Sequence, residues 1–304
     1  MKLLITGASG FVGRVAQRVL GGVALEDDSG DMVDLRNPDQ LKRAVERAMR
    51  AGCDSVLHLA AQSAIPESFA NPKETFEINF LGTFHLLQAL QELGFRGRML
   101  FVGSGDVYGD VPPEALPILE SHPLRPLNPY AVSKAAAEVL CYQWSMSSDI
   151  NVIMTRSFNH TGPGQTDRFF VSSMAKQIAE MKLGRAPLTL QIGDLEVSRD
   201  FLDVRDVVSA YGLLLEKGQR GEVYNVCSGK EVSLRHVLDR LLALANVDPQ
   251  IHVDESRLRK TDRRRVFASC DKLKQQTGWQ PEISLDQTLQ DVLDFWQGEL
   301  TWQK

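Results

Sequence analysis

The first half of the chain alternates short apolar runs with longer stretches in which apolar residues recur at helical spacing. The apolar runs predict buried strands at 3–6, 55–61, 98–102 and 151–155. The amphipathic stretches predict helices at 11–20, 38–52, 72–94 and 128–144. A further strand within 22–25 is poorly marked because its apolar run is short. This regular alternation predicts an α/β fold with a doubly wound parallel sheet.

A glycine turn connects the first predicted strand to the first helix. Gly7, Gly10 and Gly13 follow the strand at once, in the spacing Gly-x-x-Gly-x-x-Gly. Such a turn presents backbone N–H groups and the positive end of a helix, where a pyrophosphate can bind. The turn therefore predicts a dinucleotide site. The acidic residues at 26–28 suit the ribose hydroxyls of NAD, but they equally suit a solvated turn, so the cofactor preference stays open.

Tyr130 and Lys134 lie four residues apart in a helix that the N-cap residue Asn128 predicts. This spacing puts the phenol and the ammonium on one helix face. A free Tyr has a pKa of about 10, and we expect the adjacent ammonium to lower it toward general acid–base work. Ser104 follows the strand at 98–102, at the edge of the sheet where ligands bind, and its hydroxyl could bond a substrate oxygen.

Composition excludes several classes of function. The chain has 304 residues, of which 43% are hydrophobic and 24% charged, and its net charge of −5 provides no basic field for nucleic acid or an anionic membrane. The four cysteines are scattered, which argues against a metal site or a disulfide framework and fits a reducing cytoplasm. The sequence shows neither a signal peptide nor an apolar run long enough to cross a membrane, so we expect a cytoplasmic protein.

Together these motifs resemble the extended short-chain dehydrogenase/reductase family, in the branch that acts on nucleotide-diphosphate sugars. The residues that carry the resemblance are Gly7, Gly10, Gly13, Asp34, Leu35, His58, Leu59, Ala60, Ala61, Asn79, Ser104, Gly109, Tyr130 and Lys134. The resemblance covers essentially the whole chain. It implies a Rossmann-type dinucleotide-binding domain over 1–158, to which segments near 200–226 return, and a smaller, mainly substrate-binding domain over 159–304.

The resemblance also implies the residues of the site. Ser104, Tyr130 and Lys134 would form the catalytic set around a nicotinamide, with Lys134 also bonding the nicotinamide ribose. NADPH or NADH would be bound by Gly7, Gly10, Phe11, Val12, Gly13, Asp34, Leu35, Leu59, Ala60, Ala61, Asn79, Tyr130 and Lys134. The mid-helix amide of Asn79 has poor helix propensity, so we expect it to make specific bonds. We expect His58 to be a packed strand residue.

Beyond residue 156 the segments are similar to those of GDP-mannose 4,6-dehydratase and its relatives. The resemblance implies that the substrate is bound by Ser104, Gly105, Asp106, Asn159, Lys182, Arg199, Arg259 and Asp262. An Arg fork suits a diphosphate because its planar donors bind two oxygens at once. Without the resemblance, Lys182 and Arg199 would be interpreted as surface charge. Asp262 stands where the relatives have Glu.

The segment after Ser104 departs from the dehydratase pattern. Dehydratases of this family have Glu at the position of Asp106, where it removes a proton from sugar C5. Asp is one methylene shorter, which withdraws the carboxylate by about 1.5 Å. We therefore expect hydride transfer without elimination. The sequence is most similar to reductases that convert GDP-4-keto-6-deoxy-mannose to GDP-D-rhamnose.

Other functions stay open at this point. A GDP-mannose 4,6-dehydratase or a nucleotide-sugar 4-epimerase would share every residue named. A regulator that senses the cofactor without turnover is an alternative from another class, since a fold does not fix a function. Exposed faces of the helices at 72–94 and 128–149 could form a homodimer, or a dimer of dimers, as members of the family often do, but their apolar residues could equally belong to the core of a single chain.

Overall fold

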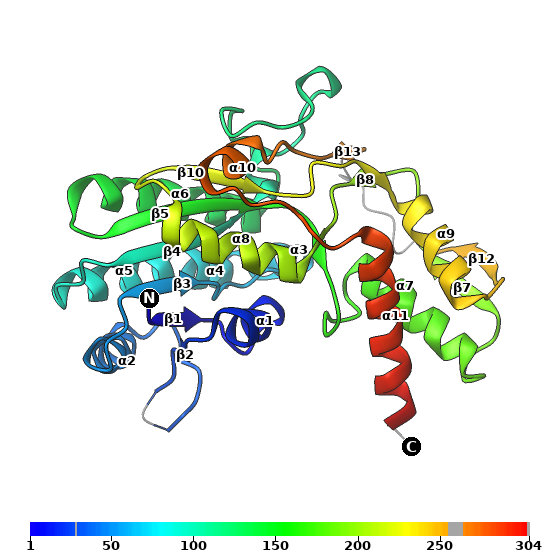
Figure 1. Cartoon of the computed structure of the whole chain (residues 1–304), viewed down its shortest axis with the longest axis horizontal. Helices are drawn as coiled ribbons and strands as arrows, with labels where there is room; N and C mark the ends of the chain where they lie inside the picture. The colour runs from blue at the N-terminus through cyan, green and yellow to red at the C-terminus, as the bar shows by residue number, and fades with distance from the viewer. Residues whose placement is uncertain (28, 255–263, 303–304) are drawn as a thin grey trace.

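The structure is a computed structural model that describes residues 1–27, 29–254 and 264–302. Its central element is a parallel sheet of six strands (Figure 1). From one edge to the other the strands are β2 (Val23–Ala24), β1 (Leu3–Thr6), β3 (Ser55–His58), β4 (Arg98–Ser104), β5 (Asn151–Ser157) and β10 (Val223–Val226). The predicted doubly wound parallel sheet is confirmed, and the poorly marked second strand is a two-residue strand at its edge.

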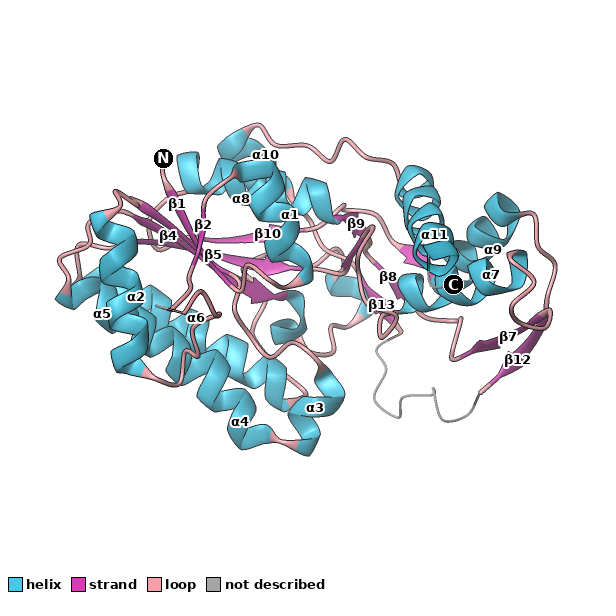
Figure 2. Ribbon diagram, turned by 90° about the horizontal axis from the view of Figure 1, so that it is seen from below, coloured by secondary structure: helices cyan, strands magenta, loops and turns pink. Residues whose placement is uncertain are grey.

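Helices cover both faces of this sheet (Figure 2). One layer contains α1 (Phe11–Leu20), α8 (Val204–Lys217) and α10 (Asp271–Thr277), and the other contains α2 (Pro38–Arg50), α5 (Gly82–Glu92) and α6 (Pro129–Ser147). Every residue of β1 and of β3 is buried. This burial explains why these strands are mostly apolar, since both of their faces lie under helices.

The helix predicted over 72–94 is interrupted. After α3 (Ile65–Ala70), the chain forms α4 (Pro72–Phe76), then a π-helical turn η1 (Glu77–Leu81), and then α5. Asn79 lies in the middle of the π turn and is buried. Single π turns inside helices frequently occur at functional sites.

A second group of elements lies beside the sheet (Figures 1 and 2). It contains α7 (Phe170–Lys182), α9 (Leu234–Ala245) and α11 (Leu285–Trp302), with the parallel strand pair β7 (Thr189–Ile192) and β12 (Gln250–Val253). These helices share an apolar core of their own. α8 and β10 return the chain to the main sheet. The division of the chain into two domains at residue 158 stays a prediction.

Short strands join the two groups. β6 (His160–Thr161) pairs with β9 (Leu202–Asp203), and β8 (Ser198–Arg199) lies between β11 (Val232–Ser233) and β13 (Arg265–Val266). In the described part of the chain, we find no helix with the length and apolar character that crossing a bilayer requires.

Candidate active site

The glycine turn after β1 is built by close contacts that only glycine permits. Gly7 has a φ of 69°, and a Cβ there would lie 2.7 Å from the backbone nitrogen of Ala60. A Cβ at Gly13 would lie 2.2 Å from the carbonyl oxygen of Gly7. The N-cap residue Gly10 has no side chain to cap α1, so the first N–H groups of the helix face the turn. The turn therefore presents N–H groups to which an anionic group could bind, and the contact of these glycines with a cofactor stays a prediction.

The segment after β3 forms the opposite side of this turn. Leu59, Ala60 and Ala61 are half-buried there, as are Phe11 and Val12 in the first turn of α1. The two sides meet where the missing side chain of Gly7 leaves room for the backbone of Ala60.

His58 supports this arrangement from the core. Its Nδ1 lies 2.7 Å from the Thr6 hydroxyl, which accepts a hydrogen bond from the backbone N–H of Ala60, and its Nε2 lies 3.0 Å from the Thr83 hydroxyl. Burial lowers the pKa of His58 to about 3, with the charge of Lys134 acting in the same direction. The ring is therefore neutral at physiological pH. The prediction that His58 is a packed residue is confirmed.

Asn79 makes specific bonds, as predicted. Its Oδ1 accepts from the backbone N–H of Gln62 at 2.8 Å, and its Nδ2 donates to the Gln62 carbonyl at 3.0 Å and to the Ser133 hydroxyl at 2.9 Å. Ser133 in turn donates to the carbonyl of Tyr130. Asn79 thus ties the segment after β3 to the helix that carries Tyr130, and its direct contact with a cofactor stays a prediction.

Gln62 is a candidate that the sequence reasoning missed. Its side-chain oxygen Oε1 is buried and accepts no hydrogen bond within the described residues. A buried acceptor without a donor is unfavourable, and a ligand hydroxyl or amide could satisfy it. Together, the glycine turn and this acceptor fit a dinucleotide with its ribose hydroxyls.

Asp34 and Leu35 lie between β2 and α2. Three hydrogen bonds join the Asp34 carboxylate to the guanidinium of Arg36, at 3.0, 3.0 and 2.8 Å, and this partner holds the pKa of Asp34 below its usual value. Leu35 is buried, and its carbonyl oxygen lies 2.9 Å from Nδ1 of His85. The contact of Asp34 and Leu35 with a cofactor stays a prediction.

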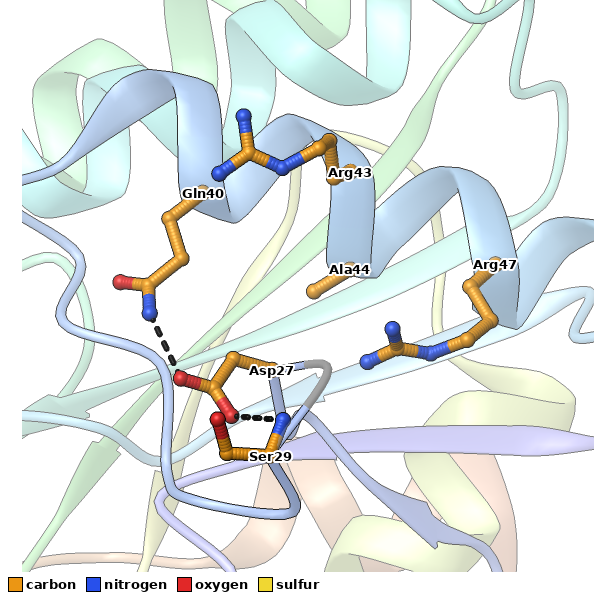
Figure 3. Close-up of a pocket in the computed structure, with 6 residues that line it drawn as sticks. All are labelled: Asp27, Ser29, Gln40, Arg43, Ala44 and Arg47. Atoms are coloured by element: carbon orange, nitrogen blue, oxygen red, sulfur yellow. Dashed lines mark hydrogen bonds between the residues drawn. The ribbon is translucent and has the colours of Figure 1, made fainter.

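The acidic residues after β2 include Asp27, whose carboxylate closes a turn of its own. It accepts from the backbone N–H groups of Ser29 and Asp31 and from Nε2 of Gln40, at 2.8, 3.1 and 2.8 Å. These backbone bonds lower the pKa of Asp27. Figure 3 shows the small pocket here, lined by Asp27, Ser29, Gln40, Arg43, Ala44 and Arg47. Of the two alternatives for 26–28, these bonds favour the structural turn; Asp28 lies outside the described residues.

Ser104 and Tyr130 come together at the carboxyl end of the sheet. Ser104 is the last residue of β4, and its hydroxyl accepts from the backbone N–H of Asp106 at 3.2 Å. The side chain of Asn128 caps α6 by accepting from Ala131 N–H, which fixes Tyr130 in the first turn. Burial raises the pKa of Tyr130, the charge of Asp106 raises it further, and a hydrogen bond with the Ser104 side chain lowers it.

Lys134 lies on the same helix face, but its ammonium has a different partner from the one predicted. Nζ donates to the carbonyl of Val102 at 2.7 Å and lies 4.9 Å from the centre of the Phe101 ring. Burial lowers the pKa of Lys134 to about 8. The prediction that the ammonium lowers the pKa of Tyr130 is therefore wrong for this structure, because burial of the phenol outweighs the other influences.

Gly105 lies between Ser104 and Asp106 and faces the aromatic ring of Phe158. A Cβ at this position would lie 2.9 Å from Cζ of Phe158, whose ring stacks on that of Tyr108. A side chain here would require the Phe158 ring to shift. Any role of Gly105 toward a substrate would thus involve its backbone. Asp106 is half-buried in the short 3-10 helix that follows.

Comparison with known proteins agrees with this geometry. The family model described as GDP-mannose 4,6 dehydratase matches residues 30–292. The chain belongs to this family. As a GDP-mannose dehydratase family member, it also belongs among the extended short-chain dehydrogenases/reductases that act on nucleotide sugars, and the predicted resemblance is confirmed.

The chain is also similar to individual proteins of known activity, among them a reductase. The chain is 46% identical, over 98% of its length and 98% of the relative, to GDP-6-deoxy-D-mannose reductase of Pseudomonas aeruginosa. The structure of RMD from Pseudomonas aeruginosa complexed with NADPH is 45% identical, with a TM-score of 0.91 over 98% of this chain and 99% of the other. A Thermus thermophilus UDP-glucose 4-epimerase complexed with NAD is 29% identical, with a TM-score of 0.83 over the same shares.

The residues that we predicted to bind the substrate lie on several elements of the structure. Asn159 follows β5 and is exposed, and Lys182 is the exposed last residue of α7. Arg199 is half-buried in β8. Arg259 and Asp262 lie outside the described residues. The roles of all five toward a substrate stay predictions.

Asp200 is a supporting residue that the sequence reasoning missed. Its buried carboxylate accepts from the backbone N–H and the hydroxyl of Ser228, both at 2.7 Å, and from Gly229 N–H at 3.0 Å. Burial raises the pKa of Asp200 to about 6, against the effect of these bonds. The carboxylate therefore fixes the strand that carries Arg199 to the loop after β10. An acid beside a predicted phosphate-binding Arg was the available signal.

Proposed function

We propose that this protein reduces the C4 keto group of a GDP-4-keto-6-deoxy-hexose, with NADPH or NADH as the hydride donor, and forms GDP-D-rhamnose. The observation that carries the proposal is the meeting of the Ser104 and Tyr130 side chains at the carboxyl end of the sheet, with Lys134 on the same helix face. The similarity to a GDP-6-deoxy-D-mannose reductase over 98% of the chain supports the substrate class.

The residues divide the work of the reduction. A nicotinamide cofactor, when bound, would supply the hydride for C4. The hydroxyls of Ser104 and Tyr130 orient the carbonyl, and Tyr130 gives its proton to the oxygen as negative charge develops there. A raised pKa suits this direction of reaction, because it keeps Tyr130 protonated and ready to donate at neutral pH. The ammonium of Lys134 would bond the nicotinamide ribose.

NADPH is the cofactor that we expect to be used more readily. The supporting observation is that RMD, 45% identical to this chain, was solved with NADPH, although related epimerases and dehydratases were solved with NAD.

The four cysteines are free and buried, which supports a location in the reducing cytoplasm.

A 4,6-dehydratase is the alternative that the family supports. Against it stand Gly105, which faces the Phe158 ring, and the short carboxylate of Asp106. The two reactions differ in one measurable property. A reductase consumes one reduced nicotinamide for each sugar, whereas a dehydratase or an epimerase regenerates its cofactor in place.

The deciding experiment measures nicotinamide absorbance after purified protein is mixed with GDP-4-keto-6-deoxy-mannose and either NADPH or NADH. We expect stoichiometric loss of the reduced cofactor, faster with NADPH. A parallel reaction with GDP-mannose is the control and should yield no keto-sugar. Conversion of GDP-mannose without net loss of cofactor would instead identify a dehydratase.

We further propose that the protein is a homodimer through the outer face of α6. Exposed apolar side chains recur there at helical spacing, at Val132, Val139, Tyr142 and Met146. A row of this kind leaves apolar surface in water that a second copy of the chain would bury.

Replacing Val139 by Glu is expected to convert the dimer to a monomer, because a carboxylate would be buried in the centre of the apolar row. Val139 is 61% exposed within one chain, so the change should leave the fold intact. Light scattering after size-exclusion chromatography measures the mass. Val19→Glu on α1, where Val19 is 51% exposed, is the matched control and should stay dimeric. A dimer for both variants would place the interface elsewhere.

A further inference from the structure

One side chain connects the dinucleotide turn to the loop after β5. Arg14 lies in the second turn of α1, directly after Gly13. Its Nη1 donates to the carbonyl of Ser9 at 2.6 Å, and its Nη2 donates to the carbonyl of Gly164 at 3.2 Å. Ser9 belongs to the glycine turn, whereas Gly164 belongs to residues 159–165, which we call the 159–165 loop. Arg14 and Gly164 are 150 residues apart in the sequence, so a single planar guanidinium links two remote segments.

An aromatic contact joins the same two segments. The ring of Phe11 stacks on the ring of His160, with centroids 6.3 Å apart and planes 7° from parallel. Burial lowers the pKa of His160, so the stacked ring is neutral at physiological pH. Beside this contact, a Cβ at Gly162 would lie 2.6 Å from Cγ1 of Val204. The loop therefore sits tightly against α1 and α8.

Hydrogen bonds between residues of the 159–165 loop hold it together as a unit. Thr161 donates to Oε1 of Gln165 at 2.8 Å, and Nε2 of Gln165 donates back to the carbonyl of His160 at 2.9 Å. Ser172 of α7 donates to the Gln165 carbonyl. A ligand that fixes Asn159 at one end of the loop would therefore also fix the carbonyl of Gly164.

We propose that Arg14 is a positioning residue that couples the binding of the dinucleotide to the binding of the nucleotide sugar. This inference rests on the proposed function, because it assigns the glycine turn to the first ligand and the 159–165 loop to the second. When either ligand orders its own segment, Arg14 and the Phe11–His160 stack hold the other segment in place. The second ligand then loses less conformational entropy on binding.

Linkage requires the coupling to be reciprocal: each ligand must raise the affinity of the other by the same factor. Such factors are typically about 5 to 150. Arg14 is an exposed residue, and water competes for its hydrogen bonds, so we expect a factor near the lower limit, about fivefold.

A second bridge to the same region is not expected to contribute. Arg168 forms an ion pair with Glu67 of α3 at 3.0 Å, but the two side chains are 72% and 46% exposed. Exposed pairs of this kind contribute little because both side chains rearrange freely in water. Arg168 therefore provides a matched control for Arg14.

The test uses isothermal titration of the full chain with NADPH and with GDP, each alone and in the presence of a saturating concentration of the other. In the unaltered protein we expect each ligand to strengthen the other about fivefold. Arg14→Met should reduce this factor to less than about twofold, and Arg14→Lys should recover part of it, since Lys donates without the planar fork. Arg168→Met and Arg18→Met, the latter on the exposed side of α1, should retain the factor.

The outcomes separate this inference from the proposed function. If neither NADPH nor GDP binds, the proposed function is at fault. If both ligands bind and the coupling factor of Arg14→Met equals that of the unaltered protein, the inference is overturned. It is also overturned if Arg14→Met weakens both ligands while their mutual factor persists, because Arg14 would then only support the fold.

Discussion

Tyr130→Phe is expected to lower kcat by about 10²- to 10⁴-fold, the contribution usual for a positioned general acid. The variant keeps the ring and loses only the hydroxyl that would protonate the sugar oxygen. The lost hydrogen bond with Ser104 should reduce the stability by only about 0.5–1.5 kcal/mol. We expect the Kd for the GDP-sugar to change far less than kcat, because the lost interaction acts mainly in the transition state. Single-turnover kinetics and titration calorimetry measure the two quantities.

Tyr224→Phe is the matched control for that variant. Tyr224 is also buried, but its hydroxyl accepts a hydrogen bond from the backbone N–H of Gln219, near β10 at the edge of the sheet. Its kcat should therefore be unchanged. Full activity of Tyr130→Phe would refute the proposed proton donor, whereas equal losses in both variants would indicate damage to the fold.

Glu138→Leu is expected to cost about 3–5 kcal/mol of folding free energy, because it leaves the Arg156 charge buried without its partner. The two side chains are only 8% and 7% exposed, and two parallel hydrogen bonds of 2.9 and 2.6 Å join them. Arg156 also donates to the hydroxyl of Tyr108. For a chain of this size, we expect the loss to lower Tm by about 5–8 °C. Thermal unfolding followed by circular dichroism measures it.

Two further variants separate the buried charge from general damage. Removing both charges, in Glu138→Leu with Arg156→Met, should restore much of the lost Tm, because no uncompensated charge remains. Glu92→Leu breaks an exposed ion pair with Lys42 and should cost at most about 1 kcal/mol. A loss in Glu138→Leu no larger than in Glu92→Leu would contradict the expectation.

The sheet and its helices were predictable because their signals are local. The mostly apolar runs at 3–6 and 55–61 exist because β1 and β3 are covered on both faces. The Asn128 cap and the glycine turn mark the starts of α6 and α1 in the sequence itself. β2 was weakly predicted because a two-residue edge strand that is only partly covered needs few apolar residues. The π turn around Asn79 has no comparable sequence signal.

The site was predictable in its members but not in their contacts. Spacing placed Tyr130 and Lys134 on one helix face, but the choice of Lys134 Nζ for the Val102 carbonyl depends on β4, which is remote in sequence. The sign of the Tyr130 pKa shift likewise depends on burial, which a motif does not encode. Gly105 was predicted only as a substrate-binding residue, and its position against the Phe158 ring is not visible in the sequence. Tertiary packing determines each of these outcomes.

The order of the strands in the sheet also determines when each strand can find its neighbour during synthesis on the ribosome. β5 ends at Ser157, yet its outer neighbour β10 begins only at Val223. At a synthesis rate of about 5–20 residues per second, β5 waits about 3–13 s for that neighbour. During this interval its open backbone edge can pair with another chain. The nascent protein is therefore most vulnerable to aggregation after its nucleotide-binding half has been made, and a chaperone would protect it most in that interval.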